Sequence, residues 1–189
     1  MEEDVRVNTI TSDTGRFVIE GIPPPYRLGV NAQMHGYIMQ YYDSTQVWEN
    51  ADMFTVRGTD MVEGVVFELI LGGTVTGRVV DADTGTPIAD AWIEALTTQG
   101  DRRSETNTDS DGWYTLGGIP SGSYRIKAQA DRWGYIQRYY GGGRSSRSAD
   151  LVTVTGAETI NGIDIAMIRG AAISGRITDA ATGNPIVGM

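Results

Sequence analysis

The stretch from Gly72 to Ala91 returns at Gly170 to Met189, and this repeat limits the possible folds more than any other feature. The two stretches read GGTVTGRVVDADTGTPIADA and GAAISGRITDAATGNPIVGM, at a spacing of 98 residues. At the same spacing, 26–91 and 124–189 share 24 identities in 66 positions. Such a period indicates an array of small domains. We therefore expect 1–71 to be a partial first repeat lacking its opening strands, 72–169 a complete second repeat, and 170–189 the opening strand of a third.

The short hydrophobic runs within each repeat predict strands. Apolar residues alternate with polar ones at 26, 28 and 30, and again at 124, 126 and 128, which is the period of a half-buried strand. Gly, Pro, Asn and Asp separate the runs, as in turns of all-β proteins. The predicted fold is all-β, with tandem seven-stranded antiparallel β-sandwich modules of transthyretin-like or immunoglobulin-like type. Further strands are expected at 37–42, 54–56, 65–69, 75–80, 91–96, 135–140, 152–154 and 163–167.

The alternation also predicts which side chains form the core of the second repeat. Inward positions of each expected strand carry branched or aromatic residues, and a repeat of this size buries a core without staples. The predicted core comprises Val75, Val79, Ile93, Tyr114, Leu116, Ile119, Tyr124, Ile126, Ile163 and Ile165.

The charge and the absent residue types exclude several classes of function. The net charge is −9 and the isoelectric point about 4.5, which argues against nucleic acid and anionic membranes as partners. With no cysteine, the chain has no disulfide, thiolate metal site or cysteine nucleophile. No run is apolar enough for membrane insertion, and no signal sequence is recognisable, so we expect any signal or anchor to lie outside this segment.

Three motifs of the second repeat resemble a known family. They are G-x-V-x-D-x-x-T-G-x-P-I from Gly77 to Ile88, T-D-x-D-G-x-Y-x-L-x-x-I-P-x-G-x-Y from 108 to 124, and a Tyr-Tyr-Gly loop followed by A-D-x-V-T-V-x-G from 139 to 156. Together they resemble the carboxypeptidase regulatory-like module, a transthyretin-like β-sandwich. The resemblance implies a non-catalytic appendage of a peptidase, or a tandem repeat of secreted and surface proteins. Some relatives lie beside starch-binding-like modules of carbohydrate-binding-like fold.

Polar candidates for chemistry are few. His35 is the only histidine and aligns with Trp133, so the position does not require an imidazole, and a catalytic or zinc site needs more converging groups. The run Asn107, Asp109, Asp111 has the spacing that opens a calcium loop, but Gly118 stands where an EF-hand needs glutamate. We expect a plain Asp-Gly hairpin there, with calcium as the alternative, and no cofactor elsewhere.

The only lysine, Lys127, is the one candidate for a cross-link found in some surface β-modules, in which a lysine is joined to an asparagine or aspartate. Lys127 alternates with the apolar positions 124, 126 and 128. It should therefore face solvent, and no internal isopeptide bond is expected.

Three tryptophans remain without a core role. The strand pattern leaves Trp92 and Trp113 outside, and Trp133 aligns with the polar His35. These side chains are either packing surfaces for neighbouring modules or a platform for stacking sugar rings. The leading hypothesis is a structural or interaction repeat of a secreted or cell-surface protein whose partners are neighbouring repeats. The alternative is a carbohydrate-binding module appended to a secreted enzyme, which binds a glycan through these tryptophans.

The two incomplete repeats are complementary. Residues 170–189 carry opening elements for which the first repeat has no counterpart, and a lone strand bearing Ile173 and Ile177 is unstable by itself. We therefore expect strand exchange, in which residues 172–178 pair with the first repeat of another copy.

Overall fold

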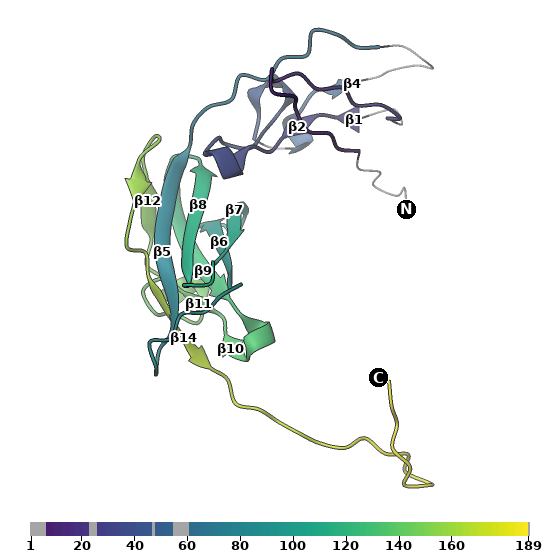
Figure 1. Ribbon diagram of the computed structural model, residues 1–189, viewed down its shortest axis with the longest axis vertical. Coiled ribbons are helices and arrows are strands. Elements are labelled where there is room, and N and C mark those ends of the chain that lie inside the picture. The colour runs from purple at the N-terminus through teal and green to yellow at the C-terminus, as the bar shows by residue number, and fades with distance from the viewer. Residues whose placement is uncertain (1–6, 23–25, 47, 55–60, 189) are drawn as a thin grey trace.

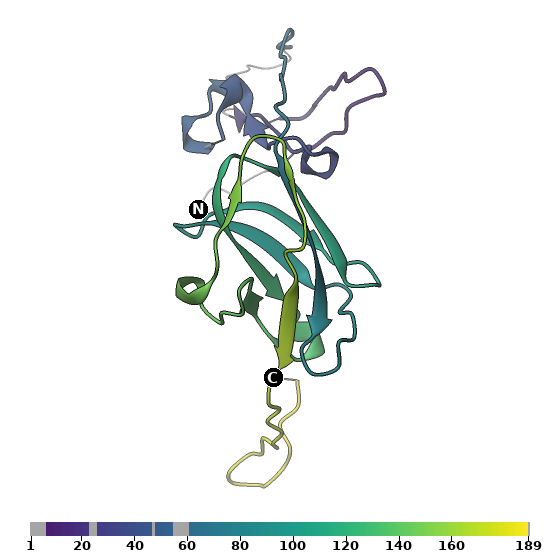
Figure 2. The ribbon, with the colours of Figure 1, turned by 90° about the vertical axis from the view of Figure 1, so that its left-hand side faces the viewer.

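The computed structural model describes residues 7–22, 26–46, 48–54 and 61–188. A β-sandwich formed by residues 73–169 lies between an N-terminal part with short strands and an extended C-terminal segment (Figures 1 and 2). One sheet has the order β11-β9-β6-β7, with β12 also on β9, and the other β10-β14-β5-β13, with β8 also on β5. The strands are β5 (Gly73–Asp81), β6 (Trp92–Thr97), β7 (Arg102–Asn107), β8 (Trp113–Ile119), β9 (Gly122–Gln129), β10 (Tyr135–Ile136), β11 (Arg138–Tyr139), β12 (Val152–Val154), β13 (Thr159–Ile160) and β14 (Ile165–Arg169).

The core lies between these two sheets. Side chains of β5 alternate between buried and half-buried along its whole length, because successive residues of a strand point to opposite faces. All ten residues predicted for the core are buried, and the all-β sandwich is confirmed. Removing these apolar side chains from water is the main driving force for the fold.

Two features depart from the predicted seven antiparallel strands. β13 and β14 pair with β5 in parallel, with Ile165 opposite Val79, because the chain crosses from β12 to the other sheet before it runs beside β5. The expected strand at 135–140 is split. Tyr135–Ile136 pairs with β14 and Arg138–Tyr139 with β9, so the chain changes sheets at Gln137.

The N-terminal part contains β1 (Tyr26–Arg27), β2 (Gly29–Val30), β3 (Gln40–Tyr41) and β4 (Met53–Phe54). Their pairing recurs in the sandwich at the repeat spacing. Tyr26 lies opposite Phe54 as Tyr124 lies opposite Val152, and Gly29 lies opposite Tyr41 as Lys127 lies opposite Tyr139. Short 3₁₀ turns are η1 (Gln33–His35), η2 (Tyr42–Ser44) and η3 (Trp48–Asn50) here, and η4 (Asp131–Trp133) and η5 (Ser146–Ser148) in the sandwich.

The strand predicted at Val65–Leu69 is not formed, and Phe17–Ile19 also lies outside any strand. Their counterparts in the sandwich, β14 and β8, both pair with β5. No equivalent of β5 lies beside them among the described residues, so they have no ladder to join. Their side chains still gather, since the Phe17 and Phe67 rings are 6.3 Å apart. The expected strand at 54–56 is represented by Phe54 alone, because Thr55 and Val56 lie outside the described residues.

The C-terminal segment leads away from the sandwich (Figure 1). Within the described residues, 171–177 join no strand, and Ile173 is fully exposed. The turn that follows is formed nevertheless. Asp179 Oδ1 accepts the backbone N–H groups of Ala181 and Thr182, as Asp81 Oδ1 accepts those of Asp83 and Thr84. In the described part of the chain, no helix is long and apolar enough to cross a lipid bilayer.

Candidate functional site

The three candidate glycan-binding tryptophans are exposed but do not share one surface. Trp92 begins β6 and Trp113 begins β8, which belong to different sheets. The residue after each is buried, so both indoles point outward from opposite faces of the sandwich. Each has an arginine guanidinium over its ring at 5.5 Å, from Arg102 for Trp92 and from Arg78 for Trp113.

Trp133 ends the 3₁₀ turn η4 and is 52% exposed. His35 occupies the same place in η1 and is also exposed. Both turns end on a glycine with positive φ, Gly36 at 79° and Gly134 at 75°. The shape of this loop therefore comes from the backbone, and the residue at its third position is free to vary between imidazole and indole.

The calcium candidates form a hairpin turn. Asp109 Oδ1 accepts the backbone N–H groups of Asp111 and Trp113, both at 2.9 Å, which is the usual role of aspartate in a turn. Asn107 ends β7, opposite Trp92. Among the described residues, no group of three or more His, Cys, Asp or Glu side chains is placed to hold a metal ion.

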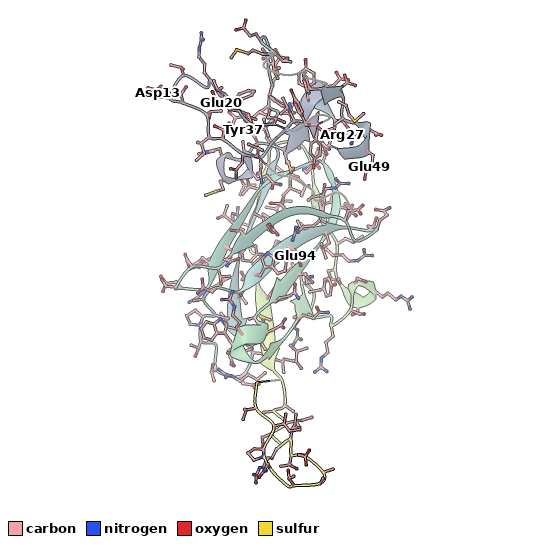
Figure 3. The ribbon with its side chains drawn as sticks, turned by 90° about the vertical axis from the view of Figure 1, so that its right-hand side faces the viewer. Asp13, Glu20, Arg27, Tyr37, Glu49 and Glu94 are labelled. Carbon is pink, nitrogen blue, oxygen red and sulfur yellow. The ribbon has the colours of Figure 1, made fainter. Side chains whose placement is uncertain are left out.

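The prediction that Lys127 faces solvent is wrong. Its side chain is only 16% exposed, and its ammonium forms an ion pair with Glu94. Glu94 lies on the outer face of the β11-β9-β6-β7 sheet (Figure 3) but is 6% exposed at its side chain. The two residues are directly opposite across β6 and β9. A buried carboxylate needs such a partner, because desolvation of an unpaired charge is costly.

Two further side chains extend this charged cluster along the sheet. Arg102 Nη1 lies 3.6 Å from Glu94 Oε1 and 2.6 Å from Glu105 Oε2. Its guanidinium also covers Trp92. The cluster of Trp92, Glu94, Arg102, Glu105 and Lys127 therefore consists of paired charges beside one aromatic ring on the outer side of this sheet. Sequence analysis missed Glu94. No sequence pattern identifies it, because its pairing with Lys127 depends on the register between β6 and β9.

A second polar network lies at the opposite sheet and is structural. Asp81 Oδ2 accepts the Tyr135 hydroxyl at 2.7 Å and Arg169 Nε at 3.1 Å. The Tyr135 hydroxyl, then the Thr84 backbone N–H, and also Arg169 hold the pKa of Asp81 well below its usual range. These contacts join the end of β5 to β10 and β14.

The buried hydroxyl of Tyr114 is also used in the fold. It donates to the carbonyl oxygen of Ile163 at 2.5 Å. Burial of the ring raises the pKa of Tyr114 far above its ordinary value. This phenol therefore stays protonated and holds β8 to the segment that leads into β14.

Between the N-terminal part and the sandwich lies an open cleft of about 300 Å³. Gln46 lines it from one side, and the turn at 97–99 and the segment 120–124 line it from the other. Its lining side chains are mostly small and polar, so it differs from the apolar pocket of a small-molecule site.

A family model matches the sandwich. The family model of the carboxypeptidase regulatory-like domain matches residues 74–167. A search of curated proteins finds no match to the chain. Among solved structures, a type II cohesin–X-dockerin complex from Acetivibrio cellulolyticus is 24% identical, over 52% of this chain and 59% of that one, with a TM-score of 0.36.

Two other similar structures come from different kinds of protein. The minor pilin of Streptococcus agalactiae is 22% identical over 56% of this chain and 48% of that one, with a TM-score of 0.38. The 5-hydroxyisourate hydrolase of Klebsiella pneumoniae is 16% identical over 52% of this chain and 94% of that one, with a TM-score of 0.34. The chain thus spans 59% and 48% of the cohesin-complex and pilin chains.

Proposed function

Because residues 74–167 form a carboxypeptidase regulatory-like domain, we propose that this chain is a non-catalytic structural segment of a secreted or cell-surface multidomain protein. Its modules follow one another as 1–71, 72–169 and 170–189, the first and third being parts of the same unit. They serve as spacers and protein-interaction units, and their partners are the neighbouring repeats of the same polypeptide.

The observation that carries this proposal is the recurrence of the same backbone contact where one repeat leads into the next. Gly72 N–H donates to the Gly36 carbonyl at 2.9 Å, and Gly170 N–H donates to the Gly134 carbonyl at 2.8 Å. The neighbouring bonds recur as well. The Tyr42 N–H donates to the carbonyl oxygen of Leu28, and the Tyr140 N–H donates to the carbonyl oxygen of Ile126. The chain therefore passes from one repeat into the next with the same backbone geometry at both boundaries, as expected for an array of modules.

The buried polar groups fit a structural function. In the sandwich, Asp81 holds strand ends together, Tyr114 ties two segments of one sheet, and Glu94 is paired with Lys127. Asp81 and Glu94 have partners on other strands, and Tyr114 bonds to the segment before β14, so each of these groups joins separate parts of the sandwich. A catalytic site instead needs such groups to converge on a shared space for substrate.

Glycan binding is the second candidate, and the exposure of the tryptophans favours it. Trp113 is 52% exposed, and an indole face of this kind stacks on sugar rings in the same way as on other apolar planes. Since Trp92 and Trp113 lie on opposite faces, each would bind a sugar by itself.

Affinity electrophoresis through a panel of soluble polysaccharides, with a glycan array, separates the two candidates. We expect the chain to migrate without retardation and to bind no glycan on the array. Retardation that is lost in Trp113→Ala, but kept in Trp133→Ala, would instead establish Trp113 as a sugar-binding residue and overturn the purely structural proposal. Circular dichroism of both variants verifies that they are folded.

A further inference from the structure

In the N-terminal part, the loop at 32–37, which contains η1, packs against the sandwich. The Gln33 side-chain amide donates to the backbone carbonyl of Arg103 in β7. Gly117 and Gly118 of β8 lie directly beneath the loop. A Cβ on Gly117 would be 2.8 Å from the Gln33 carbonyl oxygen, and one on Gly118 would collide with the Tyr37 carbonyl. The two backbones therefore touch, and this contact requires glycine in β8.

The sandwich carries the same loop at the repeat spacing. Gly36 N–H donates to Gln33 O, and Gly134 N–H to Asp131 O, both at 2.9 Å. The N–H of Tyr37 and that of Tyr135 donate to Ala32 and Ala130 at 3.2 and 3.3 Å. The loop at 130–135 thus has the backbone shape that the loop at 32–37 uses for contact with β8.

The two loops differ in what covers them. Gln33 and Gly36 are half-buried against β8, whereas their counterparts Asp131 and Gly134 are exposed. Met34 is 98% exposed although its loop is seated, so the contact covers only one side of the turn. The segment after the second loop, 170–188, already repeats the sequence and the aspartate turn that open the sandwich.

We propose that the loop at 131–134 is the docking surface for a further module of the same kind, which continues the chain from Gly170. This inference rests on the proposed array of repeats. The incoming module places its β8-equivalent strand on Asp131 and Gly134, and it carries glycine where this sandwich has Gly117. Successive modules therefore meet in one fixed orientation, and the array is stiff at each junction. Asp131 replaces Gln33, and a carboxylate cannot donate to a backbone carbonyl as the Gln33 amide donates to Arg103, so this junction lacks that one hydrogen bond and relies on the backbone contact.

The test extends the chain by one complete module and measures the accessibility of the loop. Residues 1–169 are followed directly by a second copy of 72–169, which places the copied Gly72 where Gly170 stands and keeps the repeat spacing. The protein has no cysteine, so Asp131→Cys introduces a single thiol whose rate of reaction with a soluble disulfide reagent reports its exposure. Arg132→Cys is the matched control, because its counterpart Met34 stays exposed in the seated loop.

We expect the thiol at 131 to react roughly tenfold more slowly in the extended chain than in 1–189, since the junction must open before the reagent enters. The thiol at 132 should react at the same rate in both. Gly117→Ala in the appended copy should restore the fast reaction at 131, because the atoms nearest to that Cβ all belong to the loop.

Equal rates at 131 in the two chains, with the appended copy folded by circular dichroism, would overturn the inference and leave the modules joined flexibly. That result would not affect the proposed non-catalytic function, which the glycan measurements test separately.

Discussion

At the residue scale, the atoms around Gly77 leave no space for a side chain. A Cβ at this position would collide with the Ile163 carbonyl and lie 2.8 Å from the Tyr114 hydroxyl oxygen. Gly77→Ala should therefore lower the free energy of unfolding by about 2–4 kcal/mol, as overpacked core substitutions do. A Cβ at its counterpart at the repeat spacing, Gly175, would have no atom of the described residues within 4 Å beyond its chain neighbours. Gly175→Ala should leave the urea denaturation midpoint unchanged, and equal effects of the two substitutions would contradict this account.

The ion pair between Glu94 and Lys127 gives a second residue-level prediction. Lys127→Met removes the closest partner of a buried carboxylate and should destabilise the sandwich by about 2–4 kcal/mol in urea denaturation. Combining it with Glu94→Leu removes the unpaired charge as well, and most of the stability should return. A double variant that is no more stable than Lys127→Met would show that the pair is not what fixes these side chains.

The burial of these two residues could not be predicted from alternation. The pattern showed correctly that Trp92 and Lys127 point away from the core, and it predicted the ten core residues that are buried. It did not show that the outer face of this sheet is itself covered by cross-strand neighbours. Glu94 is buried by residues from β7 and β9, and those contacts depend on register, which the period of a single strand does not reveal.

At the element scale, Asp81 links three strands through Tyr135 and Arg169. Because the folded state lowers the pKa of Asp81, the resulting stabilisation is complete above the unfolded pKa of about 3.9 and is lost as the pH falls below it. The melting temperature of the wild type should therefore exceed that of Asp81→Asn at neutral pH, and the difference should shrink below about pH 4. The matched control is Asp179→Asn, since Asp179 is exposed and its hydrogen bonds within the described part of the chain stay inside its own turn. A difference that persists unchanged at low pH would contradict the assignment.

Most strands of the sandwich could be predicted, but β7, β13 and several of the strand pairings could not. The alternation of apolar and polar residues predicted β5, β6, β8 and β9, which are among the longer strands of the sandwich. It could not show that β14 runs parallel to β5, because parallel and antiparallel strands alternate alike. It also could not predict that Val65–Leu69 stays outside any ladder, since a strand needs a partner beside it and sequence alone shows only the propensity.

At the scale of the whole molecule, strand exchange between copies stays a prediction. The C-terminal segment exposes Ile173 completely and Ile177 by 56%, and the segments around Phe17 and Phe67 in the N-terminal part belong to no strand. We expect the 189-residue chain to associate, in closed rings or open chains, by pairing residues 172–178 with another copy. Light scattering should give a larger mass for 1–189 than a monomer, whereas a chain ending at Arg169 should be monomeric. Monomers of equal stability in both cases would rule out the exchange.

The central claim is that one repeat of 98 residues is a complete structural unit. The most direct test is equilibrium unfolding of residues 72–169 by themselves, followed by circular dichroism and fluorescence. The sandwich contains both sheets and the whole buried core within these limits, so we expect a β-type spectrum and one cooperative transition with coincident probes. A helical spectrum, or a gradual loss of signal without a transition, would contradict the account.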